Sequence, residues 1–155
     1  MSEASPLELE LISDAGQLSR VRGTLRDWCL AHGWPEPVIA DMVLALDEAL
    51  TNVIRHGYDG AGDKRILIRV REVLDHGAGE GIEIEVRDFG KQVDLDSIRG
   101  RDLNKPRPGG LGVHIIHAMM DLAEYTHADG GGMRLVMRKY KSTPEQPESP
   151  STGTS

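Results

Sequence analysis

Residues 48–58 read EALTNVIRHGY, and they form the second half of a pattern that predicts a long helix. From about Pro37 to Arg55, apolar side chains recur every three or four residues, which is the spacing of one face of an α-helix. Glu48 and Asn52 are four residues apart, so their side chains leave the same face about 5–6 Å from each other. The sequence HGYDG at 56–60 is expected to end this helix.

The polar pair on this helix has two interpretations. A carboxylate such as Glu48 accepts a proton, and the side-chain oxygen of Asn52 is a ligand that a hard cation such as magnesium prefers. A solvated polar face shows the same spacing, because most surface helices carry one. The pair alone therefore identifies candidates and leaves their function open.

The regions on either side of this helix alternate between strand and helix patterns. Residues 7–12, LELELI, alternate apolar and acidic side chains, as a half-buried strand does. The Gly-rich stretch 75–81, DHGAGEG, predicts a hairpin connection. The other expected elements are a helix at 15–32, strands at 66–71 and 82–87, a helix at 112–122, and strands near 122–128 and 133–140. This order predicts an α+β fold, a two-layer α/β sandwich with helices on one face of a mixed, largely antiparallel sheet.

Bulk composition narrows the class of protein. The 155 residues predict one domain at 1–141, followed by a Pro/Ser/Thr-rich tail at 142–155 that we expect to be disordered. A formal charge of −7 disfavours direct nucleic-acid binding, because affinity for phosphate backbones comes from Lys and Arg. The single cysteine fits a reducing compartment, and no apolar run approaches the roughly 20 residues that span a bilayer. We therefore expect a cytoplasmic protein without a membrane partner.

Two further segments carry candidate chemistry. Asp88 ends a predicted strand and is followed by Phe89-Gly90, which places a carboxylate acceptor beside backbone that a ligand can approach closely. A turn that begins with Asp has the same pattern. Residues 108–116, PGGLGVHII, place glycines just before a helix, where free N–H groups and the helix dipole favour a phosphate. A flexible turn is the alternative for this segment.

The stretch before these glycines is basic, although the chain as a whole is acidic. Its cationic residues are Arg99, Arg101, Lys105 and Arg107, and Asp102 is the only acidic residue between them. A basic, aperiodic segment leading into a glycine turn is typical of a lid over a polyphosphate. A solvated loop is the alternative.

Taken together and in this order, the three segments resemble the GHKL superfamily of ATPases, which includes gyrase, heat-shock chaperones, histidine kinases and mismatch-repair proteins. EALTNVIRHGY is similar to the N box of that superfamily, DFG to its first glycine box, and GGLGVHII to its second. The pattern most resembles the anti-sigma-factor serine kinases, which are stress and sporulation switch kinases, and it spans about 7–141. The resemblance implies a Bergerat-type ATP-binding fold with ATP and Mg²⁺ as cofactors.

The resemblance also implies roles for the helix pair and the strand end. Glu48 would be the general base that activates the attacking group, and Asn52 would hold the magnesium ion that bridges the phosphates. Asp88 would accept a hydrogen bond from the adenine amino group, and Gly90 would let the base pack against the backbone.

Further roles fall on the second glycine box and the lid. Gly110 and Gly112, with Leu111 and Val113, would form the phosphate-binding turn, and Arg107 would neutralise the terminal phosphate. Two positions depart from the family pattern. Gln92 stands where the first box has its second glycine, and Met133 follows Gly132 where relatives often have a threonine.

The function implied is that of an anti-sigma factor that is also an ATP-dependent protein-serine kinase. Its substrate would be a serine of a small anti-sigma-factor antagonist with a STAS-type domain, and its second partner a sigma factor. A homodimer is also implied by the resemblance. Two alternatives remain: a non-catalytic module that binds its partner in the presence of ATP, and a switch kinase of a larger signalling complex.

Overall fold

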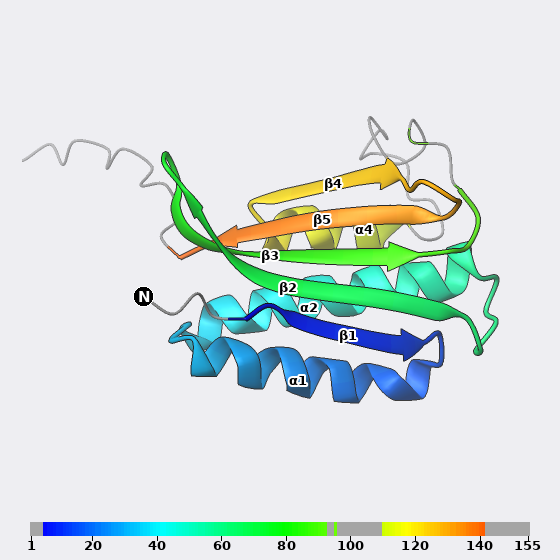
Figure 1. Ribbon diagram of the computed structural model, residues 1–155, viewed down its shortest axis with the longest axis horizontal. Coiled ribbons are helices and arrows are strands. Elements are labelled where there is room, and N and C mark those ends of the chain that lie inside the picture. Colours follow the sequence, from blue (N-terminus) through cyan, green and yellow to red (C-terminus); the bar gives the residue numbers. More distant parts are fainter. Residues whose placement is uncertain (1–4, 93–94, 96–109, 142–155) are drawn as a thin grey trace, which may run out of the picture.

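A computed structural model describes residues 5–92, 95 and 110–141, which form a helical layer and a sheet (Figure 1). The helices are α1 (Leu18–Ala31), α2 (Glu36–Asn52) and α4 (Gly110–Met119). A 3₁₀ turn at Ala15–Gln17 leads into α1, and a π-helix at Val53–Gly57 continues α2. The strands are β1 (Leu7–Ile12), β2 (Arg65–Asp75), β3 (Gly79–Asp88), β4 (Leu122–His127) and β5 (Met133–Tyr140).

The strands of the described residues form a five-stranded sheet in the order β1-β2-β3-β5-β4. Each neighbouring pair is antiparallel. Helices α2 and α4 lie behind the strands, and α1 packs beside α2 (Figure 1). The predicted two-layer α+β fold, with helices on one face of the sheet, is confirmed.

Period-2 alternation decides which face each strand residue occupies. Ile66, Ile68 and Val70 of β2 are at most 2% exposed and face the helices. On β3 the buried positions are Ile82, Ile84 and Val86. These are the positions that the alternating pattern of the two strands predicts.

The hairpin between β2 and β3 is tighter than the sequence predicts. The whole stretch 75–81 is expected to be a connection, but Asp75 pairs with Gly79 and only 76–78 lie outside the strands. Oδ1 of Asp75 accepts the backbone N–H groups of Gly77 at 2.8 Å and Ala78 at 2.9 Å. Gly79 adopts a φ of 87°, which glycine tolerates without strain. This capped turn lets the ladder continue to its last residue.

The helical layer covers the buried strand residues with apolar stripes. Helix α1, which matches the helix expected at 15–32, buries Leu18, Val21, Leu25 and Cys29, which recur every three or four residues. Cys29 is 0% exposed, and burial raises the pKa of its thiol to about 12. The predicted helix from Pro37 to Arg55 is α-helical only to Asn52, after which the π-helix widens its last turn.

The opposite face of the sheet carries ion pairs in place of a helical cover. Glu83 on this face is only 6% exposed, because Arg71 and Arg138 lie on either side of its carboxylate, at 2.6 and 2.9 Å. Burial raises the pKa of Glu83, but the two guanidinium groups outweigh that effect and lower it. The strand pattern predicts the direction of this side chain but not its burial.

Some predictions fall on residues that the structure does not describe. They are the basic segment with Arg107 and the tail at 142–155, and both stay predictions.

Candidate functional site

Asp88 lies at the end of β3 and is 3% exposed. Its Oδ1 accepts the backbone N–H groups of Gly90 at 3.0 Å and Met133 at 3.2 Å. Burial raises the pKa of this carboxyl, opposed by the bonds from Gly90 and Met133 and by the charge of Arg87. No described residue donates to Oδ2. One carboxylate oxygen is therefore fixed by the backbone, and the other is left for an external donor.

The Gly90 position shows why the loop after β3 needs a glycine. A Cβ placed there would lie 2.3 Å from the carbonyl oxygen of Gly57, at the end of the π-helix. The same oxygen accepts the backbone N–H of Lys91 at 3.0 Å. The two segments therefore pack backbone against backbone. This contact is within the chain itself, and the expected approach of adenine to Gly90 stays a prediction.

Tyr58 belongs to the site, although the sequence assigns it no role. Its ring is 8% exposed, and its hydroxyl accepts the backbone N–H of Phe89 at 2.7 Å. The hydroxyl also donates to the carbonyl of Arg65 at 2.5 Å. Burial raises the pKa of this phenol. The sequence could have pointed to this residue, because a large aromatic side chain directly follows the His-Gly that ends the helix. A small polar residue is usual in a turn at that place.

The turn between β4 and β5 closes over Asp88 from the other side. Gly132 has a φ of 80°, and a Cβ there would lie 2.1 Å from the carbonyl oxygen of Asp88. The Arg87 guanidinium donates to the carbonyls of Gly131 at 2.7 Å and Asp129 at 2.9 Å, and also to that of Asp88. The turn is thus fastened to the end of β3.

Gln92, which replaces a glycine of the family pattern, takes part in the same connection. Its Nε2 donates to the carbonyl of Ala128 at 3.2 Å and to that of Gly132 at 3.4 Å. A glycine at this position has no side chain for either bond. The Gln92 side chain therefore links the loop after β3 to the β4–β5 turn through hydrogen bonds.

Glu48 and Asn52 lie one helical turn apart on α2, as predicted, and both are half-buried. The neighbouring acid Asp47 pairs with Arg22 at 2.5 Å. In contrast, the Glu48 carboxylate makes no hydrogen bond or ion pair with any described residue. Among the described residues, nothing therefore competes with a substrate for this carboxylate.

Asn52 has an unusual environment for an amide. Its Nδ2 is buried and makes no hydrogen bond within the part of the chain that the structure describes. Burial raises the pKa of the Tyr125 hydroxyl on β4 to about 12, and the Asn52 side chain acts against that rise. Buried amide groups without a partner are rare in folded proteins, and they often mark places where a ligand or ion completes the site.

The second glycine box forms the first turn of α4. The helix begins at Gly110, whereas the sequence predicts a start near Gly112 and a turn before it. It ends at Met119, and Ile116 faces the core with 0% exposure. Backbone N–H groups in a first helical turn have no partner inside the helix, so the segment 110–113 keeps the donors that a phosphate requires.

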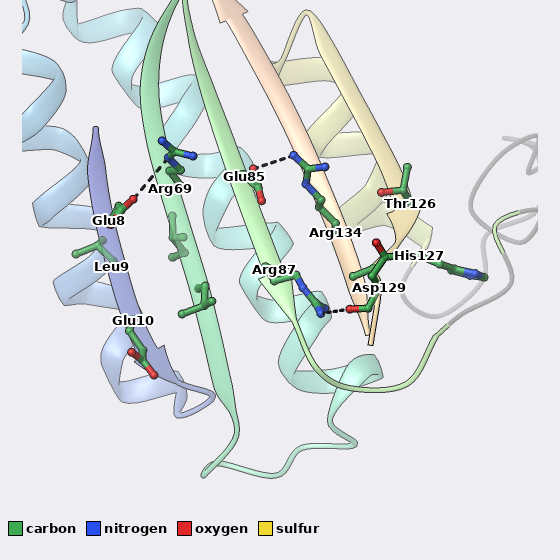
Figure 2. Close-up of a pocket in the computed structure, with 13 residues that line it drawn as sticks. Glu8, Leu9, Glu10, Arg69, Glu85, Arg87, Thr126, His127, Asp129 and Arg134 are labelled. Atoms are coloured by element: carbon green, nitrogen blue, oxygen red, sulfur yellow. Dashed lines mark hydrogen bonds and ion pairs between the residues drawn. The ribbon is translucent and has the colours of Figure 1, made fainter. Parts of the chain in front are cut away.

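A groove of about 700 Å³ lies elsewhere, on the face of the sheet that the helices leave open (Figure 2). Its walls carry the ion pairs of Arg69 with Glu8 at 3.6 Å and of Arg134 with Glu85 at 3.1 Å. None of the predicted site residues lines this groove. The candidate site is therefore the region between the end of β3, helix α2 and the start of α4.

Together, the helix-backed antiparallel sheet, the buried carboxylate at a strand end and the glycine-opened helix N-terminus define a nucleotide-binding domain. A comparison with family models identifies this domain. Residues 11–139 match the family described as histidine kinase-like ATPase domain, and the chain belongs to that family. Within residues 5–92, 95 and 110–141, no helix is both long enough and apolar enough to cross a membrane.

Individual relatives agree with this family. The chain is 28% identical over 149 residues to the serine-protein kinase RsbW of Bacillus cereus, covering 90% of this chain and 88% of that protein. The values are the same for RsbW of Bacillus anthracis. A crystal structure of the RsbU and RsbW domains of a Mycobacterium tuberculosis protein is similar, with a TM-score of 0.62 and 25% identity. That match covers 91% of this chain and 34% of the mycobacterial chain.

Proposed function

We propose that this chain is an anti-sigma factor and an ATP-dependent protein-serine kinase that phosphorylates a small anti-sigma-factor antagonist with a STAS-type domain. The observation that carries the catalytic part is the Glu48 carboxylate, which has no partner among the described residues. It lies one helical turn from the Asn52 amide, whose Nδ2 has no partner among them either. The similarity to proteins named serine-protein kinases, over 90% of this chain, supports the same activity.

The residues present fit a nucleotide at the base end of the site. The free Oδ2 of Asp88 would accept the adenine amino group, while Oδ1 stays bonded to two backbone N–H groups. An acceptor held in this way selects a base that offers a donor, as adenine does. Gly90 and Gly132, which have no room for a side chain, keep the backbone close around that carboxylate.

The phosphate end would be bound by α2 and α4. The backbone of Gly110, Leu111, Gly112 and Val113 would donate to the phosphates. Asn52 would offer its amide oxygen to the magnesium ion, and its buried, unpartnered Nδ2 is consistent with a site that a ligand completes. Bound magnesium would supply charge neutralisation, which phosphoryl transfer mainly requires. Arg107, outside the described residues, is proposed to neutralise the terminal phosphate.

Glu48 would act on the protein substrate. Its carboxylate would take the proton of the attacking serine hydroxyl, so that the oxygen gains nucleophilic character as it approaches the terminal phosphate. Asp47 is held by Arg22 and is not available for this role.

The partners of the proposed kinase are the antagonist, a sigma factor and a second copy of the chain in a homodimer. Phosphorylation of the antagonist would release the kinase to hold the sigma factor. We assign this function to residues 1–141 and place the protein in the cytoplasm.

The experiment that tests the proposal measures transfer of the labelled terminal phosphate of ATP to a purified STAS-type antagonist from the same organism. Removal of a general base costs on the order of 10²–10⁴-fold in rate, so Glu48→Ala should slow transfer by that factor and leave ATP affinity near wild type. Asp47→Ala removes the neighbouring, paired carboxylate and is the matched control, with transfer near the wild-type rate. Asn52→Ala should weaken both ATP binding and transfer.

Two outcomes would contradict the proposal in different ways. If the wild type binds ATP but transfers no phosphate, the chain is a non-catalytic module that binds its partners with ATP. If Glu48→Ala transfers phosphate at the wild-type rate, the base lies at another residue.

A further inference from the structure

We propose that Gln92 is a positioning residue for the nucleotide base, whose side-chain amide holds the peptide group that fixes the Asp88 carboxylate. That peptide group joins Gly132 to Met133 at the start of β5. The inference rests on the function proposed above, because it requires Asp88 to accept the adenine amino group. It assigns a role to a side chain that a glycine of the family pattern could not supply.

The peptide group between Gly132 and Met133 is bonded on both of its sides. Its N–H, which belongs to Met133, donates to Oδ1 of Asp88 at 3.2 Å. Its carbonyl oxygen, which belongs to Gly132, points the opposite way, because the peptide bond is trans and planar. One rigid unit therefore connects any group that binds this oxygen to the carboxylate of Asp88.

Gln92 binds this oxygen from the loop after β3. Its Nε2 donates to the carbonyl of Gly132 at 3.4 Å and to that of Ala128 at 3.2 Å. The backbone N–H of Ala128 donates to the same Gly132 oxygen at 3.0 Å. An amide nitrogen carries two hydrogens, so that of Gln92 can bridge the two ends of the β4–β5 turn. The peptide group cannot rotate without breaking these bonds.

Arg87 fastens a different part of the same turn. Its guanidinium donates to the carbonyls of Asp129 and Gly131, which precede the peptide group that bonds to Asp88. Arg87 therefore holds the tip of the turn, and Gln92 holds its last peptide group. The two side chains flank Asp88 in sequence, so the turn is joined to the end of β3 both before and after the carboxylate.

The bond from Met133 matters more for the position of Asp88 than the other bond to the same oxygen. The second donor to Oδ1 is the N–H of Gly90, at 3.0 Å, which lies two residues further along the same loop and moves with it. Met133 belongs to another strand, so its N–H sets where the carboxylate lies relative to the sheet. An acceptor held in place before binding spares the nucleotide the cost of ordering it. Bonds linked in series also strengthen one another.

The test is Gln92→Met, which keeps the length of the side chain and removes its donor. Gln92 is exposed, so this change leaves the core intact. Competition calorimetry measures the affinity for ATP and for purine riboside triphosphate, which is ATP without the amino group. The variant should lose about 3- to 10-fold in ATP affinity, which corresponds to one typical hydrogen bond, and keep wild-type affinity for the analogue.

Gln17→Met is the matched control. The Oε1 of Gln17 accepts the backbone N–H of Ile12 at 3.2 Å, in the connection between β1 and α1. This variant also replaces a hydrogen-bonding glutamine by methionine, but it leaves the β4–β5 turn unchanged. It should match wild type with both ligands.

A double variant tests whether Gln92 acts through Asp88. Asp88→Asn places an amide nitrogen where adenine requires an acceptor, so the position of that side chain no longer favours ATP. Adding Gln92→Met to Asp88→Asn should therefore change ATP affinity by less than about 2-fold, which makes the two substitutions non-additive.

The outcomes separate this inference from the proposed function. If wild type binds no nucleotide, or binds the analogue as tightly as ATP, the proposed nucleotide site itself fails. If wild type prefers ATP and Gln92→Met keeps the full preference, only the inference is overturned. An equal loss for both ligands would also overturn it, since that result identifies a general structural role. So would a 3- to 10-fold loss that persists in the Asp88→Asn background.

Discussion

The hydroxyl of Tyr58 accepts the backbone N–H of Phe89 at 2.7 Å, which joins the residue after the π-helix to the residue after Asp88. The same hydroxyl donates to the carbonyl of Arg65 at the start of β2. One side chain therefore connects three segments that are distant in sequence. Because Phe89 follows Asp88 directly, this connection also sets where the Asp88 carboxylate lies.

The Tyr58→Phe variant tests this connection. It leaves the N–H of Phe89 and the carbonyl of Arg65 without their partner, and unsatisfied buried groups cost about 1–3 kcal/mol. We expect the free energy of unfolding to fall by that amount, and ATP affinity to fall because the loop that carries Asp88 loosens. Urea denaturation and calorimetry measure the two effects. Tyr140→Phe, at the far end of β5, should leave both unchanged, and a fully stable Tyr58→Phe would contradict the role.

The Asp88→Asn variant tests the base end of the site. Two backbone N–H groups require an acceptor at the Oδ1 position, so the amide oxygen of Asn stays there and its nitrogen takes the place of Oδ2. That nitrogen would oppose the adenine amino group. Since a hydrogen bond to a charged group contributes about 1.5–3 kcal/mol, we expect ATP affinity to fall about 10- to 100-fold.

A change in base preference should accompany this loss. The new N–H donor suits a carbonyl, which guanine has where adenine has its amino group, so the ratio of ATP to GTP affinity should fall. Competition calorimetry with the two nucleotides measures that ratio. An unchanged ratio together with unchanged ATP affinity would rule out Asp88 as the adenine acceptor.

The raised pKa of Asp88 predicts a pH dependence of nucleotide binding. The folded protein holds this proton more tightly than the unfolded chain, whose carboxyl has the ordinary pKa of 3.8. The contribution of Asp88 to stability therefore falls as pH rises from 3.8 through the raised pKa. Adenine requires the ionised form, so ATP affinity should fall as pH falls through the raised pKa.

Proton release on binding is the direct measurement of this effect. Calorimetry at mildly acidic pH, in two buffers of different ionisation heat, should show wild type releasing protons as ATP binds. Asp88→Asn has the same ligand titration and lacks the carboxyl, so it is the matched control. Equal proton release by the two proteins would show that Asp88 does not titrate with the nucleotide.

The glycines of the β4–β5 turn allow a matched pair of substitutions. Gly130 and Gly132 have φ values of 87° and 80°, so alanine at either position carries a left-handed backbone penalty of about 1–2 kcal/mol. Only at Gly132 does the new Cβ also meet the carbonyl of Asp88, at 2.1 Å. We expect Gly132→Ala to lose at least about 1 kcal/mol more stability than Gly130→Ala in urea denaturation, and to weaken ATP binding. If the two variants lose the same stability, the turn must shift away from the carbonyl of Asp88 at no cost in free energy.

Most of the fold could be predicted from local periodicity. The strand at 7–12 and the inward positions Ile66, Ile68 and Val70 follow directly from alternation, because one face of each strand is buried. The apolar stripe of α2 could be predicted in the same way, from residues that recur every three or four positions. The end of that helix could not be predicted in this way, because the π-helix at Val53–Gly57 ends where Gly57 packs against Gly90, a contact between distant segments.

The parts of the candidate site that belong to short sequence motifs could be predicted. The parts that depend on how the strands pair could not. Asp88 is identified by its place at a strand end before a glycine. Met133 is not, because it acts through its backbone N–H, and a strand register is needed to bring that group to Asp88.

The burial of Cys29 has a practical consequence for labelling. The chain has a single cysteine, and a thiol that is 0% exposed with a pKa of about 12 has almost no thiolate to react at neutral pH. A cysteine introduced at Leu74, which is 74% exposed near the β2–β3 turn, would thus be the one thiol that maleimide reagents modify in the folded protein. Fluorophores or spin labels can be attached there while the native core residue is left in place.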